Sequence, residues 1–292
     1  MRLKHADPLP GNHEDLPVLK RLEAALRKRA GKRDFAREIP LLIRQAIDEV
    51  IDTTRTGRVH GNELEKTEKT YIGTKVEIVV RNYFHLPQGV LDLRIDDMDV
   101  DVKNTLGDGW MIPREAIGKP CILVASDEDR RACYFGLFVA WPKYLSESVN
   151  QDKKHSVLAE GKKNIHWLVF NQPYPPSFWS ELGDAKTHAI MRGLSGNERV
   201  ETLFREAVGV PVHRDIILDV AQQKDAMRRV RKSGGARDKL RKEGIALLSR
   251  KYDAALILEL GLPELDNNDQ FISVKPETPQ QIELLRSKGK IA

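Results

Sequence analysis

The sequence predicts an α/β (α+β) N-terminal domain followed by a mainly helical C-terminal domain. The 292 residues are enough for two domains, because domains average about 100 to 200 residues. The spacing of apolar residues changes from three-to-four to two after Pro87, as expected where helices are followed by strands. The segment 171–177 contains three prolines, which remove backbone donors and fix φ. We place the domain boundary just before it, which gives domains 1–162 and 163–292.

The composition excludes several classes of protein. Hydrophobic residues make up 40% and charged residues 31%, which is typical of a globular chain. No stretch approaches the roughly 20 apolar residues of a membrane span, and the N-terminus lacks the apolar core of a secretion signal. Cys121 and Cys133 have no C-x-x-C spacing, which indicates buried thiols in a reducing compartment. We therefore expect a cytoplasmic protein that has no membrane partner.

Two helical stretches are predicted before the change of period. The stretch 16–52 has apolar residues three and four apart, which place one apolar face on a helix: Leu42, Ile43, Ala46, Ile47, Val50 and Ile51. A second helix is predicted over 69–84, with a stripe formed by Ile72, Val76, Val79, Val80 and Tyr83. Both helices therefore have one face suited to packing on a sheet.

Strands are predicted next. Apolar and acidic residues alternate over 91–95 and again over 98–103, and more apolar strands follow at 121–125 and 132–141. If Asp96 and Asp97 form a two-residue turn, Asp92 lies opposite Asp101 on the paired strand.

Opposed carboxylates repel each other unless a cation lies between them. Lys103 is on the same face as Asp92 and Asp101, and Mg²⁺ prefers oxygen ligands of this kind. Such an ion would activate water and stabilise a phosphate under attack, with Lys103 orienting the water or stabilising the transition state. A half-solvated sheet with no metal would show the same alternation, so this pattern alone leaves both interpretations open.

The C-terminal half is predicted to contain short helices and a concentrated positive charge. The helices are expected over 200–207, 215–222, 224–231, 236–243 and 254–260, with a short strand at 245–248. Between Lys224 and Lys242 nine basic and two acidic side chains give a net charge of +7, whereas the whole chain carries +5. A focused positive surface favours nucleic acid as a partner. The candidate DNA-binding residues are Lys224, Arg228, Arg229, Arg231, Ser233, Gly234, Gly235, Arg237 and Lys239.

The spacing within this set indicates its role. Lys224, Arg228 and Arg231 lie on one face of a helix, and the glycines that follow Ser233 could present free backbone N–H groups to a phosphate. Either basic helix could be the one that enters the major groove.

Several motifs resemble known nucleases. The D-x₈-D-x-K spacing of Asp92, Asp101 and Lys103 is similar to the PD-(D/E)xK signature of restriction enzymes and of the mismatch-repair nickase MutH. Longer segments resemble the NaeI family of type II restriction endonucleases over about 54–263. They include Leu64-Glu65-Lys66-Thr67-Glu68-Lys69-Thr70, Gly73-Thr74-Lys75-Val76-Glu77-Ile78, Trp110-Met111-Ile112-Pro113, Met227-Arg228-Arg229-Val230-Arg231 and Ser233-Gly234-Gly235-Ala236-Arg237.

The resemblance implies a homodimer of two-domain chains. Each chain would have a restriction-endonuclease-like mixed sheet flanked by helices, followed by a winged-helix or helix-turn-helix domain of the CAP type. Both domains would bind double-stranded DNA, one site acting as effector for cleavage at the other. The implied catalytic residues are Glu77, Asp92, Asp101, Lys103 and Thr67, and Asp92, Asp101 and Glu77 would hold the metal.

Our leading hypothesis is a Mg²⁺-dependent type II restriction endonuclease that hydrolyses duplex DNA at a specific sequence. A cognate DNA methyltransferase is expected as a genetic partner only. Two alternatives remain. A nicking repair enzyme of the MutH kind would share the N-terminal chemistry, and a helix-turn-helix regulator without enzymatic activity would use only the basic surface.

Overall fold

The computed structural model describes residues 7–107, 109–223, 225–230 and 234–292, and the chain forms two compact units. The N-terminal unit consists of Met1–Ile51 and His60–Ser177, and the C-terminal unit consists of Asp52–Val59 and Phe178–Ala292. A membrane-crossing helix would have to be longer and more apolar than any helix in the described part of the chain.

A five-stranded mixed sheet forms the centre of the N-terminal unit, in the order β1-β2-β4-β5-β8. Its strands are β1 (Leu93–Ile95), β2 (Met98–Thr105), β4 (Pro120–Asp127), β5 (Ala132–Val139) and β8 (His166–Pro173). Strands β2 and β4 are parallel, and the other neighbouring pairs are antiparallel. The two strands predicted from the alternation and the two predicted from apolar runs are all present, and the mixed sheet agrees with the predicted fold class.

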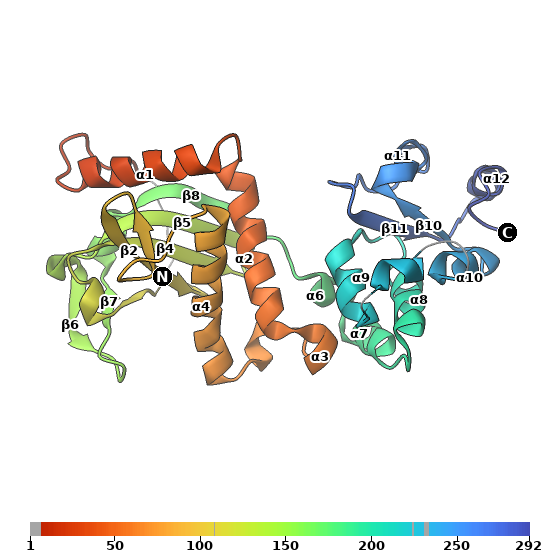
Figure 1. The fold of residues 1–292 in the computed structure, drawn as a ribbon, viewed down its shortest axis with the longest axis horizontal. Coiled ribbons are helices and arrows are strands. Elements are labelled where there is room, and N and C mark those ends of the chain that lie inside the picture. The colour runs from red at the N-terminus through yellow and green to blue at the C-terminus, as the bar shows by residue number, and fades with distance from the viewer. Residues whose placement is uncertain (1–6, 108, 224, 231–233) are drawn as a thin grey trace. The chain divides into compact units, whose positions relative to one another are not determined.

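Long helices pack on one face of this sheet. The described helices of the unit are α1 (Leu16–Ala30), α2 (Phe35–Ile51), η1 (Gly61–Glu63), α4 (Lys66–Tyr83), η2 (Arg114–Ala116), η3 (Pro142–Tyr144) and α5 (Ala159–Lys163). Helix α2 packs on β5 and β8, and α4 packs on α2 and β2 (Figure 1). The predicted stripes are confirmed, because Ile43 and Ile47 of α2 and Ile72 and Val76 of α4 are buried.

The predicted helical stretch 16–52 is two helices and not one. Helix α1 ends at Ala30, and its C-cap residue Gly31 has a positive φ of 66°, which residues other than glycine rarely adopt.

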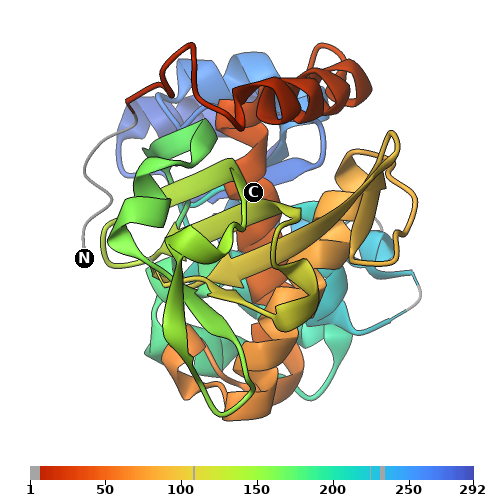
Figure 2. The ribbon, with the colours of Figure 1, turned by 90° about the vertical axis from the view of Figure 1, so that its left-hand side faces the viewer.

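The opposite face of the sheet is covered by a smaller layer. Strands β3 (Met111–Ile112), β7 (His155–Val157) and β6 (Leu145–Val149) form a second sheet in that order. In Figure 2 this segment lies in front of the central strands, and α2 and α4 lie behind them. Its core contains Trp110, whose ring N–H donates to the Val124 carbonyl at 2.8 Å.

The C-terminal unit is mainly helical, with a three-stranded sheet in the order β10-β11-β9. Its helices are α3 (Thr53–Thr56), α6 (Phe178–Leu182), α7 (Asp184–Met191), α8 (Gly196–Glu206), α9 (Arg214–Ala221), η4 (Ala226–Val230), α10 (Ala236–Lys242), α11 (Arg250–Glu259) and α12 (Pro279–Ser287). Its strands are β9 (Val212–His213), β10 (Ala246–Ser249) and β11 (Gln270–Val274). The stretch predicted as a helix at 224–231 is described in part, as the 3₁₀ helix η4.

The division between the units differs from the predicted boundary between Lys162 and Lys163. Strand β8 follows that point, yet it pairs with β5 in the central sheet, and the N-terminal unit ends at Ser177. The prolines misled the prediction because β8 is an edge strand, where a residue without an N–H group is tolerated. In addition, the segment Asp52–Val59 belongs to the C-terminal unit.

Candidate active site

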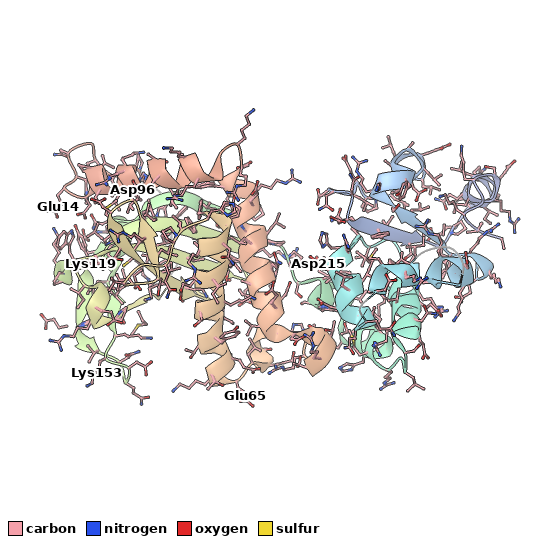
Figure 3. All side chains as sticks on the ribbon, viewed as in Figure 1. Glu14, Glu65, Asp96, Lys119, Lys153 and Asp215 are labelled. Carbon is pink, nitrogen blue, oxygen red and sulfur yellow. The ribbon has the colours of Figure 1, made fainter. Side chains whose placement is uncertain are left out.

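The β1–β2 hairpin brings the two predicted aspartates together. Leu93 pairs with Val100, Arg94 with Asp99 and Ile95 with Met98, which is the register that the sequence predicted. Asp92 immediately precedes β1, so continuing this register places it opposite Asp101 of β2. In Figure 3 the label Asp96 marks the turn of this hairpin beside α1.

Lys103 contacts both aspartates. Its Nζ lies 2.7 Å from Asp101 Oδ1 and 3.5 Å from Asp92 Oδ2, and it also donates to the Val102 carbonyl at 3.0 Å. The backbone N–H of Val102 donates to Asp92 Oδ2 at 2.7 Å, which fixes Asp92 against β2. The three predicted side chains therefore form one cluster at the edge of the sheet that β1 and β2 form.

Burial makes the charge of Asp101 unfavourable. Its side chain is 4% exposed, and its Oδ2 atom is buried without a hydrogen-bond partner among the described residues. Burial raises the pKa of Asp101 to about 7; Lys103 opposes this shift, and the negative charge of Asp92 adds to it. An oxygen that lacks a partner in this position is suited to binding a cation.

A short loop delivers Asp92 to the cluster. The Asp99 carboxylate accepts the Val90 N–H at 2.8 Å, and the Pro87 carbonyl accepts the Arg94 N–H at 3.0 Å. A Cβ atom on Gly89 would lie 2.4 Å from the Leu93 carbonyl oxygen and 2.6 Å from Asp99 Oδ1. Only glycine fits there without a backbone shift, so Gly89 and Asp99 hold the loop in place.

Glu77 on α4 lies within electrostatic range of the cluster. Burial raises its pKa and the charge of Asp92 raises it further, whereas Arg81 and Lys103 lower it. Its carboxylate is 3.6 Å from the Arg81 guanidinium and its side chain is 22% exposed. Helix α4 packs on β2, which explains why this side chain approaches the two aspartates.

The donor set suits a divalent cation that keeps part of its hydration shell. Among the residues that the structure describes, no group of three or more His, Cys, Asp or Glu side chains could hold a metal ion, so Glu77 does not complete a three-carboxylate site. The candidate ligands are therefore the carboxylates of Asp92 and Asp101, including the buried Oδ2 atom of Asp101. Mg²⁺ is typically bound by one or two carboxylates together with waters and substrate phosphates, so these residues fit it.

The basic residues of the C-terminal unit differ in their surroundings. Arg228 is exposed, with its side chain 75% accessible and 3.8 Å from Asp225. In contrast, the Lys239 ammonium lies 2.8 Å from the buried carboxylate of Glu201 on α8, so this cation joins two helices of the same unit. Arg237 is partly buried, and its Nε–H has no acceptor among the described residues.

Part of the predicted phosphate-binding turn is already used within the chain. The Gly234 N–H donates to Asp238 Oδ2 at 2.8 Å, and Gly235 is the buried N-cap residue of α10. Lys224, Arg231 and Ser233 lie outside the described residues, as does the side chain of Arg229.

The end of α9 is held by an arginine that the DNA-binding prediction did not include. Arg199 donates from Nε to the Val220 carbonyl at 2.8 Å and from NH1 to the Gly193 carbonyl at 3.0 Å. Gly196 packs beside it, where a Cβ atom would lie 2.1 Å from the Ala221 carbonyl oxygen. These contacts fix α8 against α9.

Comparison with known proteins identifies the family. The family model for the restriction endonuclease NaeI matches residues 24–281, which include most of both units. The type II restriction enzyme NaeI of Lentzea aerocolonigenes is 35% identical over 232 residues, which cover 76% of this chain and 73% of that enzyme. The chain belongs to the NaeI restriction endonuclease family.

Membership of the NaeI family makes the chain a type II restriction endonuclease, a site-specific DNA endonuclease of a restriction–modification system. Its substrate is double-stranded DNA, and restriction endonucleases generally use a divalent metal ion. The match to the NaeI family removes the alternative of a non-enzymatic regulator.

One predicted catalytic residue lies apart from the cluster. Thr67 is exposed in the first turn of α4, ten residues before Glu77, which corresponds to about 15 Å along the helix axis. In Figure 3 the label Glu65 marks the start of α4 at the bottom of the view, at the opposite end from Asp96. The structure therefore brings together Asp92, Asp101 and Lys103, places Glu77 near them, and does not bring Thr67 to them.

Two positioning residues were missed from the sequence. Asp99 and Gly89 were not among the predicted site residues, although Gly89 ends the turn motif Pro87-Gln88-Gly89. The turn motif was the one available signal, because the contact of Asp99 with the Val90 N–H depends on the folded loop.

Proposed function

We propose that this restriction endonuclease cleaves duplex DNA with Mg²⁺ held by Asp92 and Asp101. The observation that carries the proposal is the register of the β1–β2 hairpin, which sets both aspartates around Lys103. A bound Mg²⁺ would lower the pKa of water and offset negative charge on the phosphate under attack. Glu77 and Thr67 are proposed as further contributors, Glu77 through its charge near Asp92 and Thr67 through the family resemblance alone.

The residues of the chain have separate roles in this proposal. Lys103 keeps the two carboxylates close together by balancing their charge before DNA arrives. Once the phosphate is bound, its ammonium group orients the attacking water and stabilises the additional negative charge. Water attacks phosphorus in line with the departing 3′-oxygen, which leaves 5′-phosphate and 3′-hydroxyl ends. Asp99 and Gly89 keep Asp92 in register throughout.

We propose a helix-turn-helix function for the C-terminal unit. Helices α9 and α10 follow each other with η4 between them; β9 precedes α9, β10 and β11 follow α10, and the three strands form one sheet. Arg241 and Lys242 extend the basic surface on exposed positions of α10. A basic helix of this kind suits the major groove, where Arg contacts to guanine are common.

The wider biological setting is also proposed from the family. The enzyme acts as a homodimer in the bacterial cytoplasm, and the C-terminal unit binds a second DNA site that activates cleavage. A cognate methyltransferase protects the host DNA. The +7 net charge of residues 224–242 supports a separate DNA-binding surface, because phosphate contacts dominate DNA affinity.

A digestion experiment tests the proposal. Plasmid DNA incubated with the purified full-length protein and Mg²⁺ should give discrete linear fragments, and adding an oligonucleotide duplex that contains the recognition site should accelerate the reaction. Relaxed circles without linear product would favour a nicking enzyme of the MutH kind. Tight binding without any cleavage of plasmids of varied sequence would refute the nuclease proposal.

A further inference from the structure

A pocket of about 350 Å³ lies within the C-terminal unit, outside the carboxylate cluster. Residues of η4, α10, β11 and the start of α11 line it together with Arg214, the first residue of α9. Met227, Val230 and Phe271 provide its apolar surface. The volume is near the lower end of the range of roughly 300–1,000 Å³ for small-molecule sites, so it suits a group no larger than one nucleotide unit.

The charged residues of the pocket favour an anion. Among the described residues that line it, three are cations (Arg214, Arg237 and Lys251) and one is an acid, Asp269. Asp269 lies 3.6 Å from Arg214, so its charge offsets mainly that cation. Arg237 and Lys251 are then the cations that would attract an anion. The Nε–H of Arg237 is shielded from water and lacks an acceptor among the described residues. A buried donor without an acceptor is unfavourable, and an anionic ligand would relieve this cost.

An exposed aromatic ring stands at the same pocket. Tyr252 on α11 has 74% of its surface exposed, which is unusual for a large aromatic side chain. The Lys251 ammonium lies 5.2 Å from the centre of this ring. A cation beside an accessible ring offers contacts to both parts of a sugar–phosphate unit, because the ammonium suits the phosphate and the ring suits the apolar side of the sugar.

The pocket is continuous with the basic surface of α10. Arg237 belongs to both, and Arg241 and Lys242 lie exposed further along the same helix. A free nucleotide would use only the pocket, whereas cations that extend beyond it match a polymer of phosphates.

We propose that this pocket binds the sugar–phosphate backbone of DNA, with Lys251 and Arg237 contacting phosphate and Tyr252 packing against deoxyribose. The inference rests on the proposed DNA-binding function of the C-terminal unit. It extends that function to Arg214, Lys251 and Tyr252, which lie outside the basic run that the sequence indicated. Helix α11 follows β10 and precedes β11 in the chain, and these two strands pair with each other. In this proposal α11 is part of the DNA-contacting surface.

Salt-dependent binding of a fluorescent duplex tests the proposal on the full-length protein. EDTA is added to remove divalent metal ions. Without a metal, the carboxylates of Asp92 and Asp101 repel DNA, so the C-terminal unit dominates binding. We expect Lys251→Ala to reduce the slope of log K against log salt by about 1 and the affinity by roughly 10-fold. Lys288→Ala, which removes an exposed lysine of the same unit outside the pocket, should leave the slope unchanged. An unchanged slope for Lys251→Ala would overturn the proposal.

The tyrosine is tested separately. Tyr252→Ala should weaken binding at every salt concentration without changing the slope, whereas Tyr252→Phe should bind like the wild type because it keeps the ring. Equal affinity of Tyr252→Ala and wild type would refute the packing role.

Calorimetry with thymidine 5′-monophosphate separates the two possible sources of phosphate. Binding of this nucleotide that is lost in Lys251→Ala, together with an unchanged DNA slope, would show a site for free nucleotides and would overturn the proposal. If the wild type cleaves plasmid but Lys251→Ala changes neither the affinity for DNA nor its salt slope, the pocket proposal is refuted and the nuclease proposal stands. If Lys251→Ala weakens DNA binding but the wild type cleaves no plasmid, the nuclease proposal is refuted and the pocket proposal is supported.

Discussion

The two units hold their functional charges in different ways. In the N-terminal unit Asp101 is 4% exposed and is fixed by strand pairing and by Lys103. In the C-terminal unit Arg228 is 75% exposed on a helical surface, where neighbouring cations can substitute for one another. A pair of carboxylates in which Asp101 is buried depends on single atoms, whereas an exposed positive surface acts through the sum of its charges. Single substitutions should therefore have large effects in the first region and small, salt-dependent effects in the second.

The largest effect is expected at Asp101. Asp101→Asn keeps the shape of the side chain but removes the charge that would bind the metal, so the rate of plasmid cleavage should fall on the order of 10²–10³-fold. Asp97→Asn is the matched control, because Asp97 lies in the turn of the same hairpin with 69% of its side chain exposed. Cleavage should continue at the wild-type rate in this control. Similar losses in both variants would show that the hairpin has no specific catalytic carboxylate.

The loop before Asp92 should be the next most sensitive place. In Gly89→Ala the added methyl group meets the Leu93 carbonyl at 2.4 Å, which shifts the loop and moves Asp92. Small displacements of a catalytic group reduce rates strongly, and we expect a loss of about 10- to 100-fold in kcat with DNA affinity retained. Gly11→Ala provides the control, because a Cβ atom there meets nothing within 4 Å. Wild-type kcat in Gly89→Ala would contradict the role of the loop.

The pH dependence of stability should come from the buried carboxylate. Burial raises the pKa of Asp101 from 3.8 to about 7, so between these values the folded protein retains a proton that the unfolded chain has lost. The metal-free protein should therefore lose stability as the pH rises from about 4 to 7, by an amount on the order of 1–3 kcal/mol. Asp101→Asn should reduce this slope and leave the smaller contribution of Glu77, whose pKa burial also raises.

Urea unfolding followed by tryptophan fluorescence measures this effect. The signal reports mainly on the N-terminal unit, which contains Trp110, Trp141 and Trp167, whereas Trp179 lies in the C-terminal unit. A pH slope that persists unchanged in Asp101→Asn would assign the effect to other groups.

The sequence predicted the register of the β1–β2 hairpin because strand pairing is periodic. Once the turn at Asp96 and Asp97 was assigned, the alternation of apolar and acidic residues determined which carboxylates face each other. Glu77 could be placed on its helix, but its approach to Asp92 depends on how α4 packs against β2. The loop contact of Asp99 required the folded backbone and could not be predicted.

The helical region was less predictable for a physical reason. Helix positions were predicted within a few residues, for example α9 and α10, but the sequence does not show which basic side chains find acidic partners. Lys239 was expected to bind DNA, yet it lies 2.8 Å from Glu201 on another helix. The domain boundary was placed too early because the edge position of β8, which tolerates Pro173, is a property of the whole sheet.

The smallest effects are expected on α10, where two lysines should behave differently. Lys242 is exposed, so Lys242→Ala should reduce the salt slope of DNA binding by about 1. Lys239→Ala should leave that slope unchanged and lower the stability of the C-terminal unit by about 1 kcal/mol, because its ammonium is paired with Glu201. Fluorescence anisotropy at several salt concentrations and thermal unfolding measure the two quantities. Equal loss of slope in both variants would show that Lys239 contacts DNA despite its ion pair with Glu201. The distinction between structural and DNA-binding cations on α10 would then be wrong.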